Sequence, residues 1–589
     1  MQLYRHQPGA SASAAELWAF SGTSSLHRLV SGTWSSVTAS DTVTSWVTSR
    51  PYAATFNGKL FLAYDSNVNR LHVWDGTVCR RVGIEASAAP SVTDTAVAGA
   101  YTGVRYFKVQ FKIISGSNTI AVSELSAATT FTPNGAFNGA IVTKPTTPDS
   151  ATHWVVFASS DGVTYYDLSG DTVVGTTTYT TTAATSTYSA GDIAPSVGLS
   201  VPPPAAKYLL ATDNRLFMAG CFETSAASTQ TATRNSRVWF TDVLGARDDT
   251  GEDESIPQTA DTRSWVDCGE NDGDTIVGLG GPLDGAIFVF KERSIWRLSP
   301  TGNGDQPYRV DLVSRAIGAA AQDSICMGED GRGAPALYFM SMTGPKRLVM
   351  GMGIEDIGPD VRAYTSTQFS SLNSIPVLVW DSVRRVVWWF GFFGASNLDT
   401  YAFQPQFESR DEMGVRGGWT RHLIQTSGND TYCATCYDTG SVLVPYIGGR
   451  ANAGGTPYLA SFNGSSHQDG TSTTFTPSIT SAIYQPGGLL TRVGFGHAVL
   501  EWDYPGAATA ISVSVSSAIG GPLAVTGTVT GTTTSSTYST AVVQEKLESI
   551  QLADVYGLQA TITWDTAVAG SERPRIHALT IPVTAQEPA

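Results

Sequence analysis

A short pattern of alternating apolar residues, a tight turn and a Val-Trp pair occurs twice in the sequence. The first copy runs over residues 52–63 and continues at 69–75. The second copy runs over residues 208–219 and continues at 235–242. In each copy we expect one strand, a turn, and a second strand that ends in Val-Trp. A pair of strands that is apolar on both faces has to be stacked against further copies of itself.

Looser copies of this unit occur along most of the chain, and each combines two short apolar stretches with an aromatic residue near the end. They span residues 16–29, 286–298, 336–348, 377–390 and 442–462. Repeated β-hairpins at this spacing predict a β-propeller, in which each blade buries its faces against its neighbours. Because the spacing is irregular, we expect roughly six to eight blades without choosing among them.

Two segments interrupt the repeat. Residues 86–200 are rich in Ser and Thr, alternate in polarity at 104–111 and 153–157, and contain Asp161-Gly162, a pair typical of a hairpin turn. We therefore expect an inserted immunoglobulin/fibronectin-like β-sandwich here, with three prolines at 202–204 marking its exit. Because the repeat stands on both sides, this segment is interpreted as an insertion between blades.

The last part of the chain also alternates in polarity, for example at 510–515 and 558–564, and predicts a C-terminal β-sandwich. The expected organisation is all-β, with no window of helical periodicity. It comprises a first part of the β-propeller, the inserted sandwich, the remainder of the propeller and the C-terminal sandwich, at residues 1–85, 86–200, 201–465 and 466–589.

The charge balance argues against an ordinary nucleic-acid binder. Lys and Arg number 36 against 51 Asp and Glu, which gives a net charge of −15, and only 15% of the residues are charged. Phosphate contacts require clustered Lys and Arg, so such a chain suits a passage that repels DNA better than a site that binds it. We expect no membrane span, because no apolar run reaches the roughly 18 residues that a spanning helix needs. The N-terminus does not resemble a secretory signal.

Patterns that carry chemistry are missing from the sequence. It has no G-x-S-x-G elbow, no H-x-x-x-H spacing, and no glycine-rich loop that leads into a helix. The six cysteines are scattered and are expected to be reduced thiols of a protein made in a cytoplasm. We therefore expect no enzyme, no catalytic, cofactor-binding or metal-binding residue, and no cofactor.

Four weaker features were weighed. The acidic run 248–254 is interpreted as a solvated loop, with a loose cation site and a partner contact as alternatives. Cys433 and Cys436 form a C-x-x-C pair that lacks both a second ligand pair and a following helix, so we interpret them as structural. The aromatic run 388–393 is expected to fill the wedge between blades rather than to stack sugars or bases. His72 and His153 are expected to be ordinary sheet residues.

One long stretch resembles a known family. It contains Gly278-Leu-Gly280, the segment 287–297, the segment 313–319, Gly344 and the segment 353–358. Together with residues 50–76, this stretch is similar to the tail nozzle proteins of short-tailed bacteriophages, also called tail tubular protein B-like or phage stabilisation proteins. The resemblance lies in the expected propeller and carries no catalytic signature.

This resemblance implies a structural protein of the virion, located in the viral tail and synthesised in the host bacterial cytoplasm. It implies a ring of identical copies, commonly a homohexamer, that lies below the portal and its tail adaptor proteins and anchors tail fibres. The ring would continue the channel for double-stranded DNA without sequence-specific binding, retain the genome and permit its ejection. The alternative from a different class is a receptor-binding or glycan-degrading tail protein, which predicts a pair of carboxylates in a cleft.

Overall fold

The computed structural model describes residues 2–8, 15–21, 25–30, 32–39, 51–64, 70–95, 103–134, 139–148, 150–198, 200–223, 232–241, 264–304, 306–351, 353–361, 376–393, 399–411, 414–423, 429–438, 443–451, 457–461, 478–480, 493–495, 498–503, 510–519, 524–530, 543–547, 552–564 and 575–585. The fold is 61% strand and 3% helix, so the prediction of an all-β chain is confirmed. Across these ranges, no helix has the length and apolar character needed to cross a membrane.

Seven sheets of the described residues form a β-propeller, six with four strands and one with three. The strands of blades 1 to 3 are β1 (Gln2–His6), β2 (Glu16–Ser21), β3 (Ser25–Val30), β4 (Thr33–Val37), β5 (Tyr52–Phe56), β6 (Lys59–Ala63), β7 (His72–Trp74), β8 (Cys79–Arg81), β18 (Tyr208–Thr212), β19 (Arg215–Glu223), β20 (Ala232–Phe240) and β21 (Trp265–Asp267). Those of blades 4 to 7 are β22 (Ile276–Leu283), β23 (Ala286–Lys291), β24 (Ile295–Pro300), β25 (Tyr308–Ser314), β26 (Ile325–Glu329), β27 (Pro335–Ser341), β28 (Gly344–Val349), β29 (Gly353–Asp356), β30 (Val377–Asp381), β31 (Val386–Phe393), β32 (Asp399–Asp411), β33 (Gly414–Leu423), β34 (Asn429–Asp438), β35 (Leu443–Ala451) and β36 (Pro457–Ser461).

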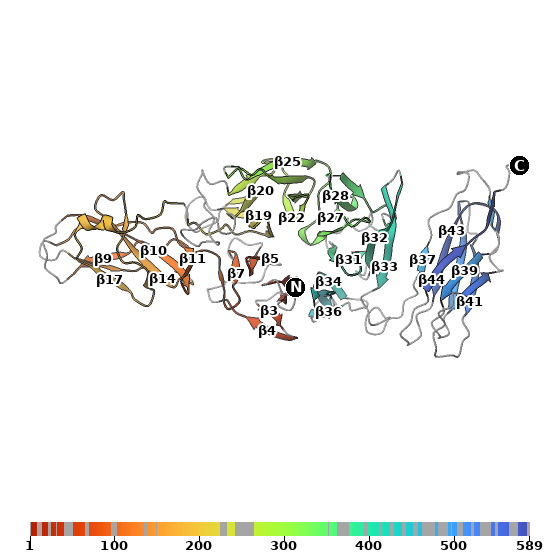
Figure 1. Ribbon diagram of the computed structural model, residues 1–589, viewed down its shortest axis with the longest axis horizontal. Coiled ribbons are helices and arrows are strands. Elements are labelled where there is room, and N and C mark those ends of the chain that lie inside the picture. The colour runs from red at the N-terminus through yellow and green to blue at the C-terminus, as the bar shows by residue number, and fades with distance from the viewer. Residues whose placement is uncertain are drawn as a thin grey trace. The chain divides into compact units, whose positions relative to one another are not determined.

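The seven blades close into a ring around a common centre (Figure 1). The first strand of each blade contacts the first strand of the next, from β1 through β5, β18, β22 and β26 to β30. In blade 7, β35 contacts both β30 and β1, which completes the circle. Each of the seven units recognised in the sequence lies in a different one of these sheets.

The expected content of one unit is wrong, because six of the seven blades have four described strands, and the seventh has three, where two were expected. The segment 52–63 is not one strand but the hairpin β5–β6, and Val73-Trp74 belongs to a third strand, β7. The turn of that hairpin is Asn57-Gly58, with positive φ at both residues (49° and 69°). A two-residue turn of this type reverses a strand without interrupting its apolar pattern. Asp213-Asn214 makes the corresponding turn in blade 3.

Alternation along the second strand of a blade decides which neighbour each side chain meets. In β6, Leu60 and Leu62 pack against blade 1 in a cluster that contains Trp18. Phe61 and Ala63, between and after them, pack against blade 3. Successive side chains of a strand point to opposite faces, so one apolar stretch supplies both seams of its blade.

The segment between β8 and β18 forms the inserted β-sandwich, in agreement with the predicted fold class. One sheet runs in the order β11-β10-β14-β15, and the second runs β17-β13-β9. The elements are β9 (Ser91–Asp94), β10 (Arg105–Ser115), β11 (Asn118–Val122), β12 (Thr129–Phe131), β13 (Ala140–Thr143), β14 (His153–Ser159), β15 (Tyr166–Asp167), β16 (Thr172–Val173), β17 (Thr178–Thr181) and the 3-10 helix η2 (Thr185–Ala190).

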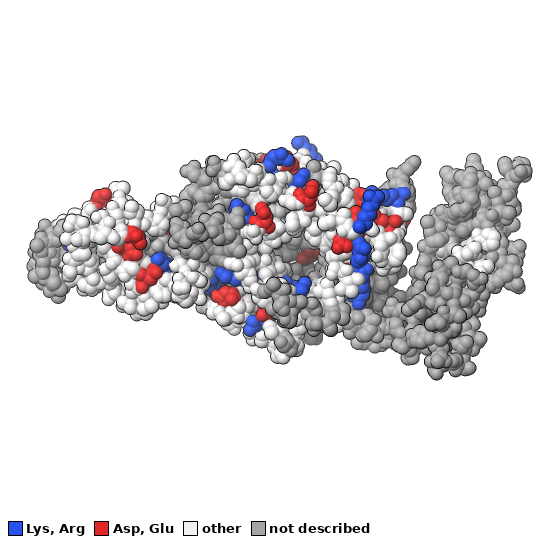
Figure 2. Space-filling view, viewed as in Figure 1, with Lys and Arg blue, Asp and Glu red and all other residues white. Residues whose placement is uncertain are grey.

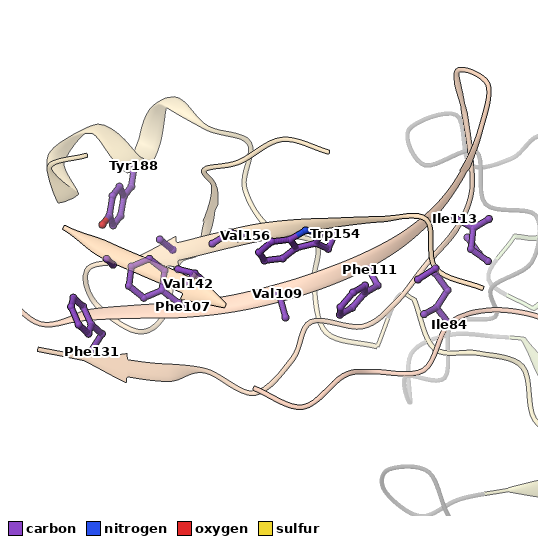
Figure 3. Close-up of a cluster of buried hydrophobic side chains, with 14 residues drawn as sticks. Ile84, Phe107, Val109, Phe111, Ile113, Phe131, Val142, Trp154, Val156 and Tyr188 are labelled. Atoms are coloured by element: carbon purple, nitrogen blue, oxygen red, sulfur yellow. The ribbon is translucent and has the colours of Figure 1, made fainter. Parts of the chain in front are cut away.

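The core of this insert lies between its two sheets (Figure 3). Phe107, Val109 and Phe111 of β10 lie beside Trp154 and Val156 of the paired strand β14, and all five side chains are fully buried. The two connections of the insert to the propeller meet side by side. Gly83 has a φ of +71°, and a Cβ on it would lie 2.9 Å from the Cβ of Pro202. A closed loop of this kind can be inserted into an existing fold at little entropic cost.

A second compact unit consists mainly of Phe462–Ala589. Its larger sheet runs β41-β40-β43-β38-β45 with β37 beside β43, and its smaller sheet runs β42-β39-β44. The strands are β37 (Ser478–Thr480), β38 (Val493–Phe495), β39 (Ala498–Asp503), β40 (Ala510–Ile519), β41 (Ala524–Thr530), β42 (Val543–Leu547), β43 (Leu552–Trp564), β44 (Arg575–Thr580) and β45 (Val583–Ala585). Val513 and Val515 pair with Ile562 and Ala560 and are buried with them, as the expected C-terminal sandwich requires.

Buried ions join neighbouring blades. Arg347 of β28 is fully buried and donates to Glu355 of its own blade (2.5 Å) and to Glu408 of blade 6 (2.7 Å). Burial by itself would lower the pKa of Arg347, but its hydrogen bonds to Glu408, Tyr338 and Glu355 raise that pKa above its ordinary value. Arg347 is therefore charged in the fold, and it neutralises two carboxylates that would otherwise repel each other across the seam.

We expect Arg347→Ala to lower the free energy of unfolding of the propeller by about 3–5 kcal/mol, because Glu355 and Glu408 lose their buried cation. Arg309→Ala is the matched control. It removes an ion pair with Asp311 whose side chains are exposed, and exposed pairs contribute less than about 1 kcal/mol. Urea unfolding followed by tryptophan fluorescence measures both changes. Equal effects of the two substitutions would contradict this account of the seam.

A buried histidine lies at the seam between blades 1 and 2. His6 Nδ1 is 3.0 Å from Thr55 Oγ1 of β5, and the side chain of His6 is buried. Desolvation by burial lowers the pKa of His6 from 6.5 to about 4. The folded state therefore keeps His6 neutral at pH values where the unfolded chain protonates it.

The stability of the propeller should consequently decrease as the pH falls from about 6.5 to about 4, by up to about 3 kcal/mol from this histidine, and its contribution should be lost below that. His6→Gln should flatten that part of the pH profile relative to the wild type. The difference between the two profiles isolates His6 from carboxylates that titrate in the same range. An unchanged slope in the variant would show that His6 is not the group responsible.

Candidate functional site

The mouth of the propeller channel is the place where residues from distant blades converge. Figure 2 shows a hollow near the centre of the propeller. At one end of the inner strands lie Gln2 at the start of β1, Tyr52 at the start of β5, and the 3-10 helix η3 (Gln322–Ser324) just before β26. Blade 5, which η3 precedes, lies across the ring from blades 1 and 2. We call Gln2, Tyr52, Gln322 and Asp323 the mouth cluster.

Hydrogen bonds span this mouth. Gln2 Nε2 donates to Asp323 Oδ1 (3.0 Å), and the Tyr52 hydroxyl donates to Asp323 Oδ2 (3.3 Å). The side chain of Gln322 accepts from the Leu279 N–H (2.7 Å) and donates to the Leu279 carbonyl (3.0 Å), which ties η3 to blade 4. The segment is thus held from three blades, and it crosses the mouth of the channel.

The chemistry of the mouth cluster favours a structural role. Glycoside hydrolysis uses two carboxylates that flank the scissile bond. The mouth cluster contains one carboxylate, and both of its oxygens accept hydrogen bonds from side chains of other blades. A general base or nucleophile needs a lone pair directed at substrate. In Asp323, these lone pairs hold blades 1, 2 and 5 together.

The C-x-x-C pair is divided between two seams. Cys433 is buried and packs with Leu3 and Ala19 of blade 1, while Cys436 donates to the Trp380 carbonyl of blade 6 (3.3 Å). Both cysteines lie on the strand β34, where residues an odd number apart face opposite sides. Burial raises the pKa of the Cys436 thiol above its ordinary value. The pair therefore offers neither a chelate nor a reactive thiolate, and within the described ranges no group of three or more His, Cys, Asp or Glu side chains is placed to hold a metal ion.

The other features singled out in the sequence have structural settings. Asp161 Oδ1 accepts hydrogen bonds from the Ser159 hydroxyl and from two backbone N–H groups, which confirms the hairpin turn. These hydrogen bonds, chiefly the one from Ser159, lower the pKa of Asp161 to about 2. Trp389 is fully buried between blades 5 and 6, as the packing interpretation predicted. His72 and His153 lie on β7 and β14, as expected of sheet residues. The acidic run 248–254 lies outside the described residues.

No sequence signal pointed to the mouth cluster. Gln2 and Asp323 are 321 positions apart, and Tyr52 and Asp323 are 271 apart. Single polar residues at the edge of an apolar stretch occur throughout the chain. Only closure of the ring brings these residues together.

Asp323→Ala should loosen the mouth without unfolding the propeller. The substitution removes two hydrogen bonds to a charged acceptor, and we expect a loss of about 1–3 kcal/mol. Hydrogen exchange should become faster at the starts of β1 and β5 and stay unchanged in the insert. Asp311→Ala, on an outer strand, is the control that should leave both regions as in the wild type. Unchanged exchange in Asp323→Ala would mean that η3 does not hold the mouth.

Comparisons with known proteins give no family. No family model matches the chain, and no curated protein matches it. Among solved structures, the chain is similar to an exo-β-1,3-galactanase from Phanerochaete chrysosporium crystallised with galactose, at 12% identity over 65% of this chain and 96% of that chain, with a TM-score of 0.23. It is also similar to the extracellular domain assigned to a one component system of B. thetaiotaomicron, at 10% identity over 98% of this chain and 73% of that chain, with a TM-score of 0.24. At TM-scores this low, neither likeness carries an argument about this chain.

Proposed function

We propose that this chain is a structural, ring-forming subunit of the tail of a short-tailed bacteriophage, of the tail nozzle kind. Copies of the chain, six in the proposed assembly, surround a channel below the portal and the tail adaptor proteins. The ring carries tail fibres, retains the double-stranded DNA genome and lets it pass at ejection. The proposal originates in the resemblance of residues 278–361 and 50–76 to that family.

The observation that supports it most is the bridged mouth of the propeller. A DNA duplex, whose major groove alone is about 12 Å wide, does not fit through an opening that Gln2, Tyr52 and Asp323 span with hydrogen bonds. The propeller of one copy is therefore a closed building block. In the proposed ring, DNA passes between copies and not through a blade ring.

Charge favours the same role. With 51 acidic against 36 basic residues, the chain carries a net charge of −15. A channel wall of this balance repels the phosphate backbone, since attraction to DNA comes mainly from clustered Lys and Arg. Weak binding suits a conduit, because a wall that held the genome tightly would slow ejection.

The test is to purify the full chain and determine its assembly by light scattering and negative-stain class averages. The proposal expects a closed ring, most simply six-fold, with duplex binding that is weak and lost at moderate salt. In virions, an antibody against the chain should label the tail along its axis. A peripheral trimer that releases reducing sugar from host-surface glycans would overturn the proposal in favour of a glycan-degrading tail protein.

A further inference from the structure

Two of the six cysteines differ from the others in exposure. Cys326 and Cys436 are partly exposed, whereas the other four are buried. Cys326 lies on β26 of blade 5, and Cys436 lies on β34 of blade 7. These two thiols are therefore the ones that a small reagent can reach, and they belong to the two blades that flank blade 6.

Cys326 points toward blade 6. It packs on the cluster at the seam between blades 5 and 6, whereas Ile325 and Met327, on either side of it, pack toward blade 4. Close contact with β30 continues two residues further along the same strand, because a Cβ on Gly328 would lie 3.0 Å from Cε3 of Trp380. The strand β26 is thus held against Trp380 where the Cys326 thiol faces blade 6.

The backbone of Trp380 contacts both thiols. Cys436 Sγ donates to the Trp380 carbonyl (3.3 Å). Cys326 Sγ donates to the Met327 carbonyl (3.2 Å) and has a hydrogen bond with the Trp380 backbone. Two sulfur atoms that contact the backbone of one residue lie near each other. In keeping with this, burial raises the pKa of Cys436 most, and the neighbours that raise it further are Asp381 and Cys326.

We propose that Cys326 and Cys436 form a dithiol site that hydrogen peroxide oxidises to a disulfide between blades 5 and 7. The first thiolate attacks one peroxide oxygen, the O–O bond breaks, and water leaves after protonation, which gives a sulfenic acid. The second thiolate attacks that sulfur, so that the S–S bond forms, the S–O bond breaks and a second water leaves. Two thiols and one peroxide thus give one disulfide and two waters. Both cysteines belong to one chain, so the inference does not depend on the proposed ring.

Burial makes this oxidation slow. It raises the pKa of Cys326 to about 12, and it raises the pKa of Cys436 as well, whereas the thiolate is the form that reacts. The pair therefore stays reduced in a cytoplasm, where thiols are kept reduced, and closes on long exposure to an oxidant. The disulfide closes a loop of chain that contains all four strands of blade 6. A bond across so long a loop restricts the unfolded chain and stabilises the fold.

Peroxide treatment of the native full chain tests the pair without any substitution. Remaining thiols are alkylated before unfolding, and peptides are mapped by mass spectrometry. We expect one pair of peptides joined through Cys326 and Cys436, loss of two of the six thiols, and reversal by dithiothreitol. The thermal midpoint of the oxidised protein should exceed that of the same sample after reduction by at least about 3 °C.

Three variants identify the partners, with far-UV circular dichroism to verify that each is folded. Cys326→Ser and Cys436→Ser each leave one thiol without its partner, so neither should form the joined peptides or gain in thermal midpoint. Cys433→Ala is the matched control, because it removes the C-x-x-C alternative and should be cross-linked as the wild type is.

Other products of the wild-type protein overturn the proposal. A disulfide between Cys433 and Cys436 assigns the reaction to the C-x-x-C pair. A sulfenic acid that finds no nearby thiol is oxidised irreversibly to a sulfinic acid, so that product at Cys326 or Cys436 shows that the two sulfur atoms do not meet. Six unmodified thiols after prolonged treatment show that the site is closed to the oxidant.

Discussion

Packing of one blade against the next is the interaction on which this structure depends. A single four-stranded sheet of this chain is apolar on both faces, so it is stable only between two neighbours. Among the described strands, the last seam is closed by side chains and not by a shared strand. Leu3 and Ala19 of blade 1 pack with Cys433 of blade 7, and the Tyr437 hydroxyl donates to the Ala15 carbonyl (3.3 Å). Loss of this seam would expose apolar faces on both sides at once.

Polar groups add specificity to seams that apolar packing alone would leave able to slide. Lys291 is fully buried and donates to Asp272 (2.7 Å), to Ser236 of blade 3 and to the Gly269 carbonyl. Hydrogen bonds to these partners require one relative position of the two blades, whereas contacts among Val, Leu and Phe side chains allow several. Arg347 has the same position between blades 5 and 6.

The mouth cluster limits what the proposed ring could use of the propeller. If the propeller is a closed block, its contribution to a channel comes from its outside. Only 15% of the residues are charged, and several of them are paired within a single blade, such as Arg237 with Asp267 and Lys346 with Asp356.

The sequence by itself determined the fold class, the insertion between blades and the packing role of Trp389, because alternation and turn residues act over a few positions. Asn57-Gly58 specifies its turn locally, although its brevity hid one strand of the unit at residues 52–75. The number of blades, the closure of the ring, and the contact of Asp323 with Gln2 and Tyr52 were decided only by the tertiary structure. The blade number and ring closure depend on how seven sheets pack around one centre. Residues 321 positions apart share no local sequence pattern that would predict their contact. Cys433 and Cys436 likewise contact different blades, because residues an odd number of positions apart on a strand face opposite sides of the sheet.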